Sequence, residues 1–419
     1  MGVCCYSLPI LSMPLFLYNR LTCFAEKNKP HFPFSVPLPS RRAVLHPAPG
    51  GLPMGKLLHN RVNRRELKAR LQEDPEKRVT LSYYKYVQLP DPHTFRDELY
   101  RVYSELGVLG RIYVAREGVN AQLSVPESQF SGFKKAMDDF GMFPNLRLNI
   151  AVEAEGKSFF ALAIKVRDKI VADGIDDPIF DPSQTGQHLS AAAFNYLSED
   201  PNTIVVDMRN HYESEVGHFK NAILPDVATF REELPMVADL LADKKARNIV
   251  MYCTGGIRCE KASAYMKYRG FENVFQLEGG IIEYARQVQA QGLENKFLGK
   301  NFVFDERLGE RISPEVIAHC HQCGAVADTH VNCANDHCHI LFIQCNSCRS
   351  AFEGCCSDTC RDFMASYTPE ERRELAKTTV FNGTKFGKGV YKAFRKSAST
   401  LLLQERAQLE TQHSTLETV

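Results

Sequence analysis

The segment at residues 249–271, IVMYCTGGIRCEKASAYMKYRGF, constrains the fold of this chain more than any other. An apolar strand runs directly into Cys253, two glycines and Arg258, and a helical segment follows. Other short apolar runs, such as NTIVVDMR and ENVFQLEG, are separated by helical segments such as SAAAFNYLSED. This alternation is typical of a parallel sheet that helices cover on both faces. We therefore expect an α/β domain at residues 180–292.

The loop between this strand and this helix has the composition of an anion-binding site. Gly255 and Gly256 permit a tight turn whose N–H groups point inward, and the next helix presents its positive N-terminal end there. Amide donors, an arginine and a helix N-terminus all lower the pKa of a cysteine, so Cys253 should be a reactive thiolate. We expect Cys253 to be catalytic, in an active-site loop completed by Thr254, Gly255, Gly256, Ile257 and Arg258. A buried inert cysteine would leave the glycines and the arginine without a purpose.

Cys259 directly follows the arginine, and two interpretations of it stay open. As a resolving thiol it would form a disulfide with Cys253. As an ordinary small buried residue on the first helical turn it would have no chemical role, which is the commoner situation for a cysteine.

Residues 180–292 resemble the rhodanese domains. Besides the loop, the resemblance rests on a D-x-R…E…G-H-I-x-x-A pattern, carried here by Asp207-Met208-Arg209, Glu213, Glu215, Gly217-His218-Phe219 and Asn221-Ala222. Six residues from Cys253 to Arg258 match the loop of the sulfurtransferases in that family, whereas the related phosphatases use one residue more. The resemblance thus implies sulfurtransferase chemistry, through a cysteine persulfide, rather than phosphatase chemistry.

The first ordered domain is expected at residues 56–175. Its pattern predicts strands at VTLSYYKYV, GRIYVAR, GVNAQLSV, LRLNIAVE and FALAIKVR, and helices at HTFRDELYRVYSEL and SQFSGFKKAMDDF. The order β-α-β-β-α-β with one added strand is that of a ferredoxin-like, or acylphosphatase-like, sandwich. Residues 1–55, which are rich in proline, are expected to be a disordered extension. Their short apolar stretch is interrupted by Pro9 and Pro14, so no membrane association is expected.

Nine of the 14 cysteines lie in a cysteine-rich region at residues 300–365. Paired thiols on tight turns suit tetrahedral zinc, so we expect metal binding rather than disulfides, and a reducing, cytoplasmic location. One site would use Cys320, Cys323, Cys345 and Cys348. A second would use Cys333, Cys338, Cys360 and either Cys355 or Cys356, of which we take Cys356. Disulfides or free thiols, an iron–sulfur cluster, and ligation by His319, His321, His337 or His339 stay open as alternatives.

Residues 366–419 are expected to be a basic helical and disordered tail. Between Lys377 and Lys396 there are six basic residues and no acidic one, interleaved with four aromatic residues. Such a segment can neutralise phosphates and stack on unpaired bases, or it can be a solvated basic tail. Because the net charge of the whole chain is only +1, any nucleic-acid surface must be local.

Residues 56–390 as a whole are similar to the bacterial tRNA uridine hydroxylases. The resemblance is carried by YYKYVQLPDP, GRIYVAREGVNAQLS, MRNHYESEVGHFKNA and MYCTGGIRCEKASAYMK. It implies oxygen-dependent 5-hydroxylation of the wobble uridine, position 34 of tRNA, with Cys253 essential and the anticodon loop as the binding partner. No flavin, haem or mononuclear-iron signature is evident in the sequence.

Two alternatives to the hydroxylase stay open. The first is a sulfurtransferase that carries a persulfide on Cys253. The second is a non-catalytic RNA-binding scaffold, which the intact Cys253 and Arg258 disfavour. For the hydroxylase we hypothesise that the thiolate adds to C6 of the uracil ring and makes C5 electron-rich.

Overall fold

The computed structural model describes residues 64–378, apart from 144–145 and 154–156. The extension expected at residues 1–55 and the tail beyond Thr378 lie outside the described residues. Within the described part of the chain, no helix is long and apolar enough to cross a membrane.

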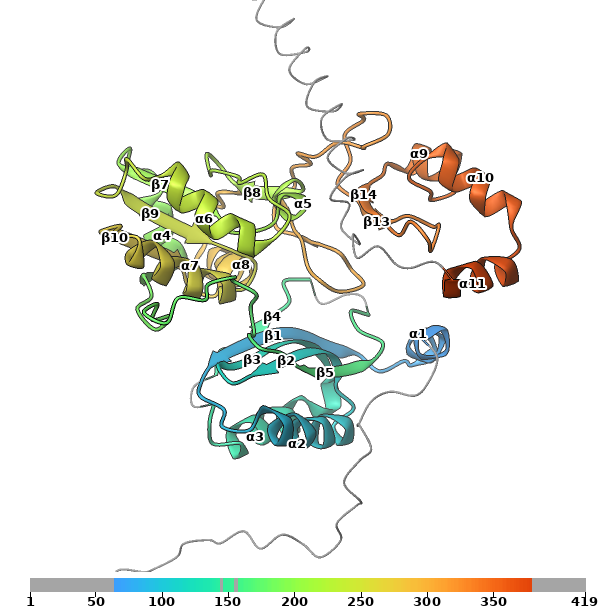
Figure 1. Cartoon of the computed structure of the whole chain (residues 1–419), viewed down its shortest axis with the longest axis horizontal. Coiled ribbons are helices and arrows are strands. Elements are labelled where there is room, and N and C mark those ends of the chain that lie inside the picture. Colours follow the sequence, from blue (N-terminus) through green and yellow to red (C-terminus); the bar gives the residue numbers. More distant parts are fainter. Residues whose placement is uncertain (1–63, 144–145, 154–156, 379–419) are drawn as a thin grey trace, which may run out of the picture. The chain divides into compact units, whose positions relative to one another are not determined.

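The N-terminal domain is a five-stranded sheet of order β4-β1-β3-β2-β5, with two helices on one face (Figure 1). Only β2 and β5 pair in parallel; the other pairs are antiparallel. The predicted ferredoxin-like order with one added strand is confirmed. Its elements are α1 (Arg64–Glu73), β1 (Arg78–Tyr86), α2 (Pro92–Glu105), β2 (Leu109–Ala115), β3 (Gly118–Pro126), a 3-10 turn (Glu127–Gln129), α3 (Phe130–Asp139), β4 (Asn149–Ile150) and β5 (Leu162–Val166).

Strand alternation gives the N-terminal sheet two different faces. On β1, Leu81 and Tyr83 are buried in the core that the sheet shares with α2 and α3. Their neighbours Ser82 and Tyr84 point to the opposite face, because successive side chains of a strand alternate. This second face is polar and is available to contact another part of the chain.

The central domain contains a four-stranded, all-parallel sheet of order β6-β10-β9-β7. Alternate residues of β9 enter different cores: Ile249 and Met251 pack against α6 and α7, whereas Val250 and Tyr252 pack on the side of α4 and α8. The predicted α/β domain is confirmed. Its elements are β6 (Gln187–Leu189), α4 (Ala191–Leu197), β7 (Thr203–Asp207), α5 (His211–Ser214), β8 (Gly217–Phe219), α6 (Phe230–Leu240), β9 (Asn248–Tyr252), α7 (Ile257–Tyr268), β10 (Asn273–Leu277) and α8 (Gly280–Gln291).

The Asp207 and Arg209 pair of the rhodanese pattern is structural. Both side chains are completely buried, and the Arg209 guanidinium donates two hydrogen bonds to the Asp207 carboxylate, at 2.8 and 2.6 Å. Arg209 also donates to the carbonyl of Gly217, the first residue of β8. The pair therefore ties the end of β7 to β8, outside the reactive loop.

The C-terminal region continues from the central domain through β11 (Phe297–Asn301), which pairs antiparallel with β8. The cysteine-rich part has its own small core around a hairpin of two short strands. Its elements are β12 (Glu310–Arg311), β13 (His330–Asn332), β14 (Leu341–Ile343), α9 (Asn346–Ala351), α10 (Asp358–Ser366) and α11 (Pro369–Thr378).

Candidate active site

Cys253 lies at the carboxyl end of β9, an inner strand of the parallel sheet, where open α/β sheets bind their ligands. The loop of residues 253–258, called the Cys253 loop below, leads directly into α7. The backbone N–H of Gly256 donates a hydrogen bond to the Cys253 Sγ at 3.2 Å. Gly256 has a φ of +97°, a conformation that favours glycine. The sequence-predicted loop therefore does direct a backbone N–H at the sulfur.

The surroundings of Cys253 favour its thiolate. Burial by itself raises the pKa of the thiol, whose residue is 1% exposed. A hydrogen bond with the Cys259 thiol, the charge of Arg258 and the backbone N–H groups of both residues outweigh burial and lower the pKa to about 6. Cys253 is thus mostly ionised at neutral pH, which is the reactive form of a cysteine.

Cys259 is the hydrogen-bonding partner of that thiolate. Burial and the neighbouring Cys253 charge hold the pKa of Cys259 well above its usual range. Its thiol therefore stays protonated and can donate to the Cys253 sulfur. The two open interpretations of Cys259 did not include this role, because the spacing of the two cysteines alone does not show that their thiols meet in the folded loop.

Arg258 is held by Glu213, a completely buried residue of α5. The guanidinium donates to both carboxylate oxygens of Glu213, at 2.7 and 2.8 Å, and makes a longer contact of 3.5 Å with Thr254. The bidentate pair fixes the direction of the arginine. Arg258 therefore acts on Cys253 mainly through its charge.

Glu233 is a second buried carboxyl group near the loop, and no sequence pattern indicated it. Among the described residues, neither of its carboxylate oxygens has a hydrogen-bond partner. Burial raises its pKa well above the usual range; the charges of Asp207, Glu213 and Cys253 add to this, while Arg258 opposes it. Glu233 is therefore a neutral acid at physiological pH. In the sequence it looks like an ordinary charged residue in the first turn of α6.

Cys253 borders a cavity of about 430 Å³ that three parts of the chain enclose. The volume falls within the roughly 300–1,000 Å³ typical of small-molecule sites. The N-terminal sheet contributes its polar face, the central domain contributes the Cys253 loop, and residues 303–305 with Arg307 and Glu310 come from the C-terminal region. The polar side chains from the N-terminal sheet are Thr80, Ser82, Tyr84, Asn120, Gln122 and Asn149.

Direct hydrogen bonds hold the N-terminal sheet against the Cys253 loop and α7. The Asn149 side-chain amide donates to the Gly255 carbonyl at 3.1 Å, and the Tyr84 hydroxyl donates to Glu260 on α7 at 2.8 Å. A Cβ added to Gly256 would lie 2.8 Å from the Tyr84 hydroxyl oxygen. Gly256 is thus required twice, for its backbone conformation and for the close approach of Tyr84.

A buried lysine locks the same junction. Lys261 of α7 is 1% exposed. Its ammonium group donates to both carboxylate oxygens of Glu117 at 2.9 Å and to one carboxylate oxygen of Asp173 at 2.5 Å. Glu117 lies in the turn between β2 and β3, and Asp173 follows the N-terminal domain. This network joins the N-terminal domain to α7, the helix that begins in the Cys253 loop.

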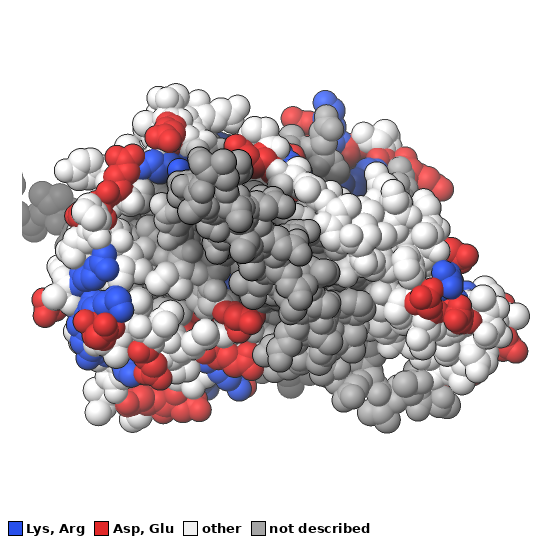
Figure 2. All heavy atoms as spheres, turned by 90° about the horizontal axis from the view of Figure 1, so that it is seen from above, with Lys and Arg blue, Asp and Glu red and all other residues white. Residues whose placement is uncertain are grey.

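The wall from the C-terminal region is also held by charge pairs. Arg307 donates to the Asp305 carboxylate at 2.7 Å and to Glu310 at 2.6 Å. Glu310 is completely buried, and burial raises its pKa. On the face seen in Figure 2, the basic side chains of the described residues lie among acidic ones rather than in one continuous patch. The basic segment from Lys377 to Lys396 lies outside the side chains that the structure describes.

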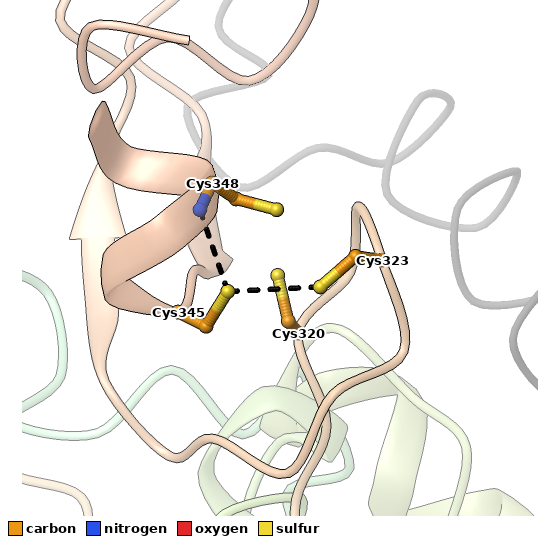
Figure 3. Close-up of side chains that lie close together, drawn as sticks. All are labelled: Cys320, Cys323, Cys345 and Cys348. Carbon is orange, nitrogen blue, oxygen red and sulfur yellow. Dashed lines mark hydrogen bonds between the residues drawn. The ribbon is translucent and has the colours of Figure 1, made fainter. Parts of the chain in front are cut away.

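The cysteine-rich region brings its thiols together in two groups. In the first group, Cys320, Cys323, Cys345 and Cys348 converge from a turn and from the start of α9, with all four sulfurs within 4.8 Å of one another (Figure 3). The second group, also within 4.8 Å, consists of Cys333, Cys338, Cys356 and Cys360. These are the sets expected from the spacing.

The open alternatives for these ligands can be compared with the structure. Cys355 belongs to neither group and is buried in the hydrophobic core of the region. His321 Nε2 lies 2.9 Å from a Glu215 carboxylate oxygen, and His337 Nε2 lies 3.1 Å from the Arg372 carbonyl oxygen. None of the four candidate histidines is in either group, and the cysteines of the described residues are all free thiols.

Comparison with protein families divides the chain as the structure does. Residues 78–170 match the family described as UPF0176 acylphosphatase like domain, and residues 190–287 match the Rhodanese-like domain. Residues 298–361 match the family described as Rhodanase C-terminal. The fold class expected from the sequence is therefore confirmed for all three regions.

Several curated proteins are similar to most of this chain. One from Pectobacterium atrosepticum, named tRNA uridine(34) hydroxylase, is 60% identical over 319 residues, which are 75% of this chain and 89% of that protein. Proteins of the same name from Yersinia enterocolitica and Photorhabdus laumondii are 57% and 56% identical and are covered over 94% and 91% of their lengths.

Proposed function

This chain belongs to the tRNA uridine(34) hydroxylase family, and on that basis we propose that it hydroxylates C5 of the wobble uridine of tRNA. Molecular oxygen is the co-substrate and Cys253 is the catalytic residue. The hydroxylated nucleoside is 5-hydroxyuridine, and the partner is the anticodon loop of tRNA. A tRNA substrate and free thiols both favour a cytoplasmic location.

One observation supports this proposal above the others: a cysteine with a pKa of about 6 borders a cavity that the N-terminal sheet helps to enclose. Enzymes that modify a base take it out of its stack and into a pocket. The polar face of the N-terminal sheet supplies amide and hydroxyl groups suited to the edge of a uracil ring. A rhodanese domain alone would present the Cys253 loop without these groups.

The chemistry follows from the thiolate. Addition of the Cys253 sulfur to C6 of the uracil ring places electron density on C5, which then reacts with oxygen. One oxygen atom stays as the hydroxyl group and the other leaves as water, which consumes two protons and two electrons from an external reductant. Arg258 and the N–H groups of the loop keep the sulfur ionised before the attack. The neutral Glu233 adds no further negative charge to the site.

The experiment is mass spectrometry of tRNA nucleosides from cells that lack the gene and carry wild-type or variant copies. We expect 5-hydroxyuridine and its derivatives with the wild-type copy, and none with Cys253→Ser or Cys253→Ala. Purified enzyme under ¹⁸O₂ should place the label on C5. Wild-type levels of the product with Cys253→Ala would eliminate the proposed role of the thiolate.

Sulfur transfer is the second candidate, because the six-residue loop directs a backbone N–H at the sulfur in a way that would also hold a persulfide. The same nucleoside analysis separates the candidates. Loss of thiolated nucleosides in the deletion strain would support sulfur transfer, and an unchanged nucleoside profile would support an RNA-binding scaffold.

We also propose that each of the two cysteine groups holds a structural zinc ion. Four thiols that converge without a disulfide are the donor set that tetrahedral zinc prefers. Elemental analysis should find two zinc ions per chain, one in Cys345→Ser, and two in the control Cys355→Ser. Visible absorption with bound iron would instead indicate an iron–sulfur cluster, and protein without metal would refute the proposal.

A further inference from the structure

Three side chains form a hydrogen-bonded chain that leads from the cavity to the surface. Tyr84 of β1 lines the cavity, and its hydroxyl donates to Glu260 Oε1 at 2.8 Å. The Nε2 atom of His188, on β6, lies 3.0 Å from the same oxygen. The side chain of Glu260 is 14% exposed and that of His188 is 38% exposed. The chain therefore becomes more accessible to solvent at each step outward.

The inner end of this chain lies close to the reactive sulfur. The Tyr84 hydroxyl oxygen is in contact with Gly256, where an added Cβ would lie 2.8 Å away. The N–H of the same glycine donates to the Cys253 sulfur at 3.2 Å. Tyr84 and Cys253 therefore flank one residue of the loop, and both border the cavity.

We propose that Tyr84 is the catalytic base that removes the C5 proton of the substrate, and that Glu260 and His188 carry this proton to solvent. The inference rests on the proposed hydroxylation and assigns to it a residue from the N-terminal domain. It also accounts for the contact of that domain with α7: the rhodanese domain contributes the nucleophile, and β1 contributes the base.

The proposed step needs no oxidant, because it follows the oxygenation. In the covalent adduct, the Cys253 sulfur is bonded to C6, and C5 carries the new hydroxyl group together with its original hydrogen. Tyr84 accepts the C5 proton while its own proton passes to Glu260 and on to His188. The electrons of the C5–H bond form the C5=C6 double bond, the C6–S bond breaks, and its electron pair leaves with Cys253 as the thiolate.

The charges around the chain suit a concerted transfer. Burial, with the charge and hydrogen bond of Glu260 and the charge of Cys253, raises the pKa of Tyr84, so a free tyrosinate does not form. Tyr84 can therefore accept a proton only while it gives its own to Glu260. Burial raises the pKa of Glu260, but hydrogen bonds with His188, Tyr84 and Gln276 outweigh it, so Glu260 is a carboxylate ready to accept a proton.

His188 is the terminal acceptor, and its surroundings define the pH dependence. The hydrogen bond with Glu260 raises the pKa of His188 above its usual 6.5; the charge of Glu278 adds to this, while burial and Arg147 oppose it. Only neutral His188 can take up the proton. The rate of adduct breakdown should therefore rise with pH through this raised pKa, and His188→Gln should remove this dependence.

The test uses the full-length enzyme, tRNA with ordinary or C5-deuterated uridine, and the variant Tyr84→Phe. General base catalysis contributes about 10²–10⁴-fold, so we expect turnover to fall by about 100-fold or more. A sulfur–tRNA adduct should accumulate on denaturing gels, and a C5 deuterium isotope effect should appear. Glu260→Gln, which keeps the shape of the relay, should behave in the same way. Alkylation of Cys253 should stay at the wild-type rate and report an intact loop.

Tyr86→Phe is the matched control. Tyr86 lies on the same strand and its hydroxyl donates to the Ile257 carbonyl at 3.4 Å, but it does not line the cavity. Its loss should leave turnover within about twofold of wild type. Wild-type turnover in Tyr84→Phe, or loss of turnover with neither adduct nor isotope effect, would overturn the proposal. Absence of 5-hydroxyuridine with the wild-type enzyme would instead contradict the proposed function itself.

Discussion

The ionisation of Cys253 can be measured directly and tested with the variant Cys259→Ala. In the folded protein, the Cys259 thiol, the charge of Arg258 and two backbone N–H groups lower the pKa of Cys253 from 9.0 to about 6. At about 1.4 kcal/mol per pKa unit, these groups favour the thiolate by about 4 kcal/mol net of burial. At pH 7 about 90% of Cys253 should be ionised, against about 1% for an unperturbed thiol.

Removal of the Cys259 thiol deletes one hydrogen bond to a charged group, worth about 1.5–3 kcal/mol. This corresponds to an increase of about one to two units in the pKa of Cys253. We therefore expect the pKa to rise to between about 7 and 8 in Cys259→Ala. At pH 6 the variant should react about 5- to 50-fold more slowly than wild type, and at pH 9 the two should react at similar rates.

The assay is alkylation with iodoacetamide between pH 4.5 and 9, with mass spectrometry of the peptide that contains Cys253. Peptide analysis separates this residue from the cysteines of the C-terminal region. Tyr268→Phe is a control on the same helix, since its hydroxyl contacts Asp177 far from the loop. A wild-type midpoint at pH 8 or above would refute the electrostatic argument. An unchanged midpoint in Cys259→Ala would refute the role of the thiol.

Three further substitutions test the packing around the site. Lys261→Met should lower the free energy of unfolding by about 3 kcal/mol in urea titrations, because it removes the buried ammonium group that Asp173 and the half-buried Glu117 share. The expected loss is at the low end of the range for a broken buried pair because Asp173 keeps its contact with Lys169. A loss below about 1 kcal/mol would contradict this. Gly280→Ala should cost about 2 kcal/mol and slow Cys253 alkylation, because Gly280 has a φ of +66° and an added Cβ would lie 2.4 Å from the Cys253 carbonyl oxygen. Glu213→Gln should lower the free energy of unfolding about as much as Lys261→Met does, because it breaks the buried pair with Arg258. Glu233→Gln should change the free energy of unfolding by less than about 1 kcal/mol, because the Glu233 acid is already neutral. Equal effects of the two substitutions would be evidence against a neutral Glu233.

Local pattern was sufficient for the topology and for the pairs of neighbouring cysteines, whereas the way in which these pairs combine into two groups was one of several possibilities in the sequence. The alternation of apolar residues along β1 and β3 and the apolar runs of β7, β9 and β10 are short-range signals. The C-x-x-C spacings are also local, because two thiols on one tight turn must face the same way. The choice between Cys355 and Cys356 was less secure in the sequence, since adjacent side chains differ in direction and only packing decides which of them enters the core.

The groups that the sequence did not reveal depend on long-range contacts. Tyr84 and Glu260 are 176 positions apart, and Lys261 and Asp173 are 88 apart. No periodicity of β1 indicates which part of the chain its polar face will meet. Glu233 is a further example: its charge suggests an exposed helical position, and only the folded core shows that the residue is buried and neutral.

These contacts explain how a loop of sulfurtransferase size can belong to a hydroxylase. The residues of the Cys253 loop determine that a thiolate forms, and this requirement is common to sulfur transfer and to addition at a uracil ring. The N-terminal sheet distinguishes the two reactions. Asn149 and the other residues of its polar face enclose a space for a planar polar ring, and Tyr84 brings a proton-accepting hydroxyl beside the sulfur. A persulfide transfer needs neither the enclosure nor the base. The specificity of this protein therefore lies in the contact between β1 and α7 more than in the loop itself.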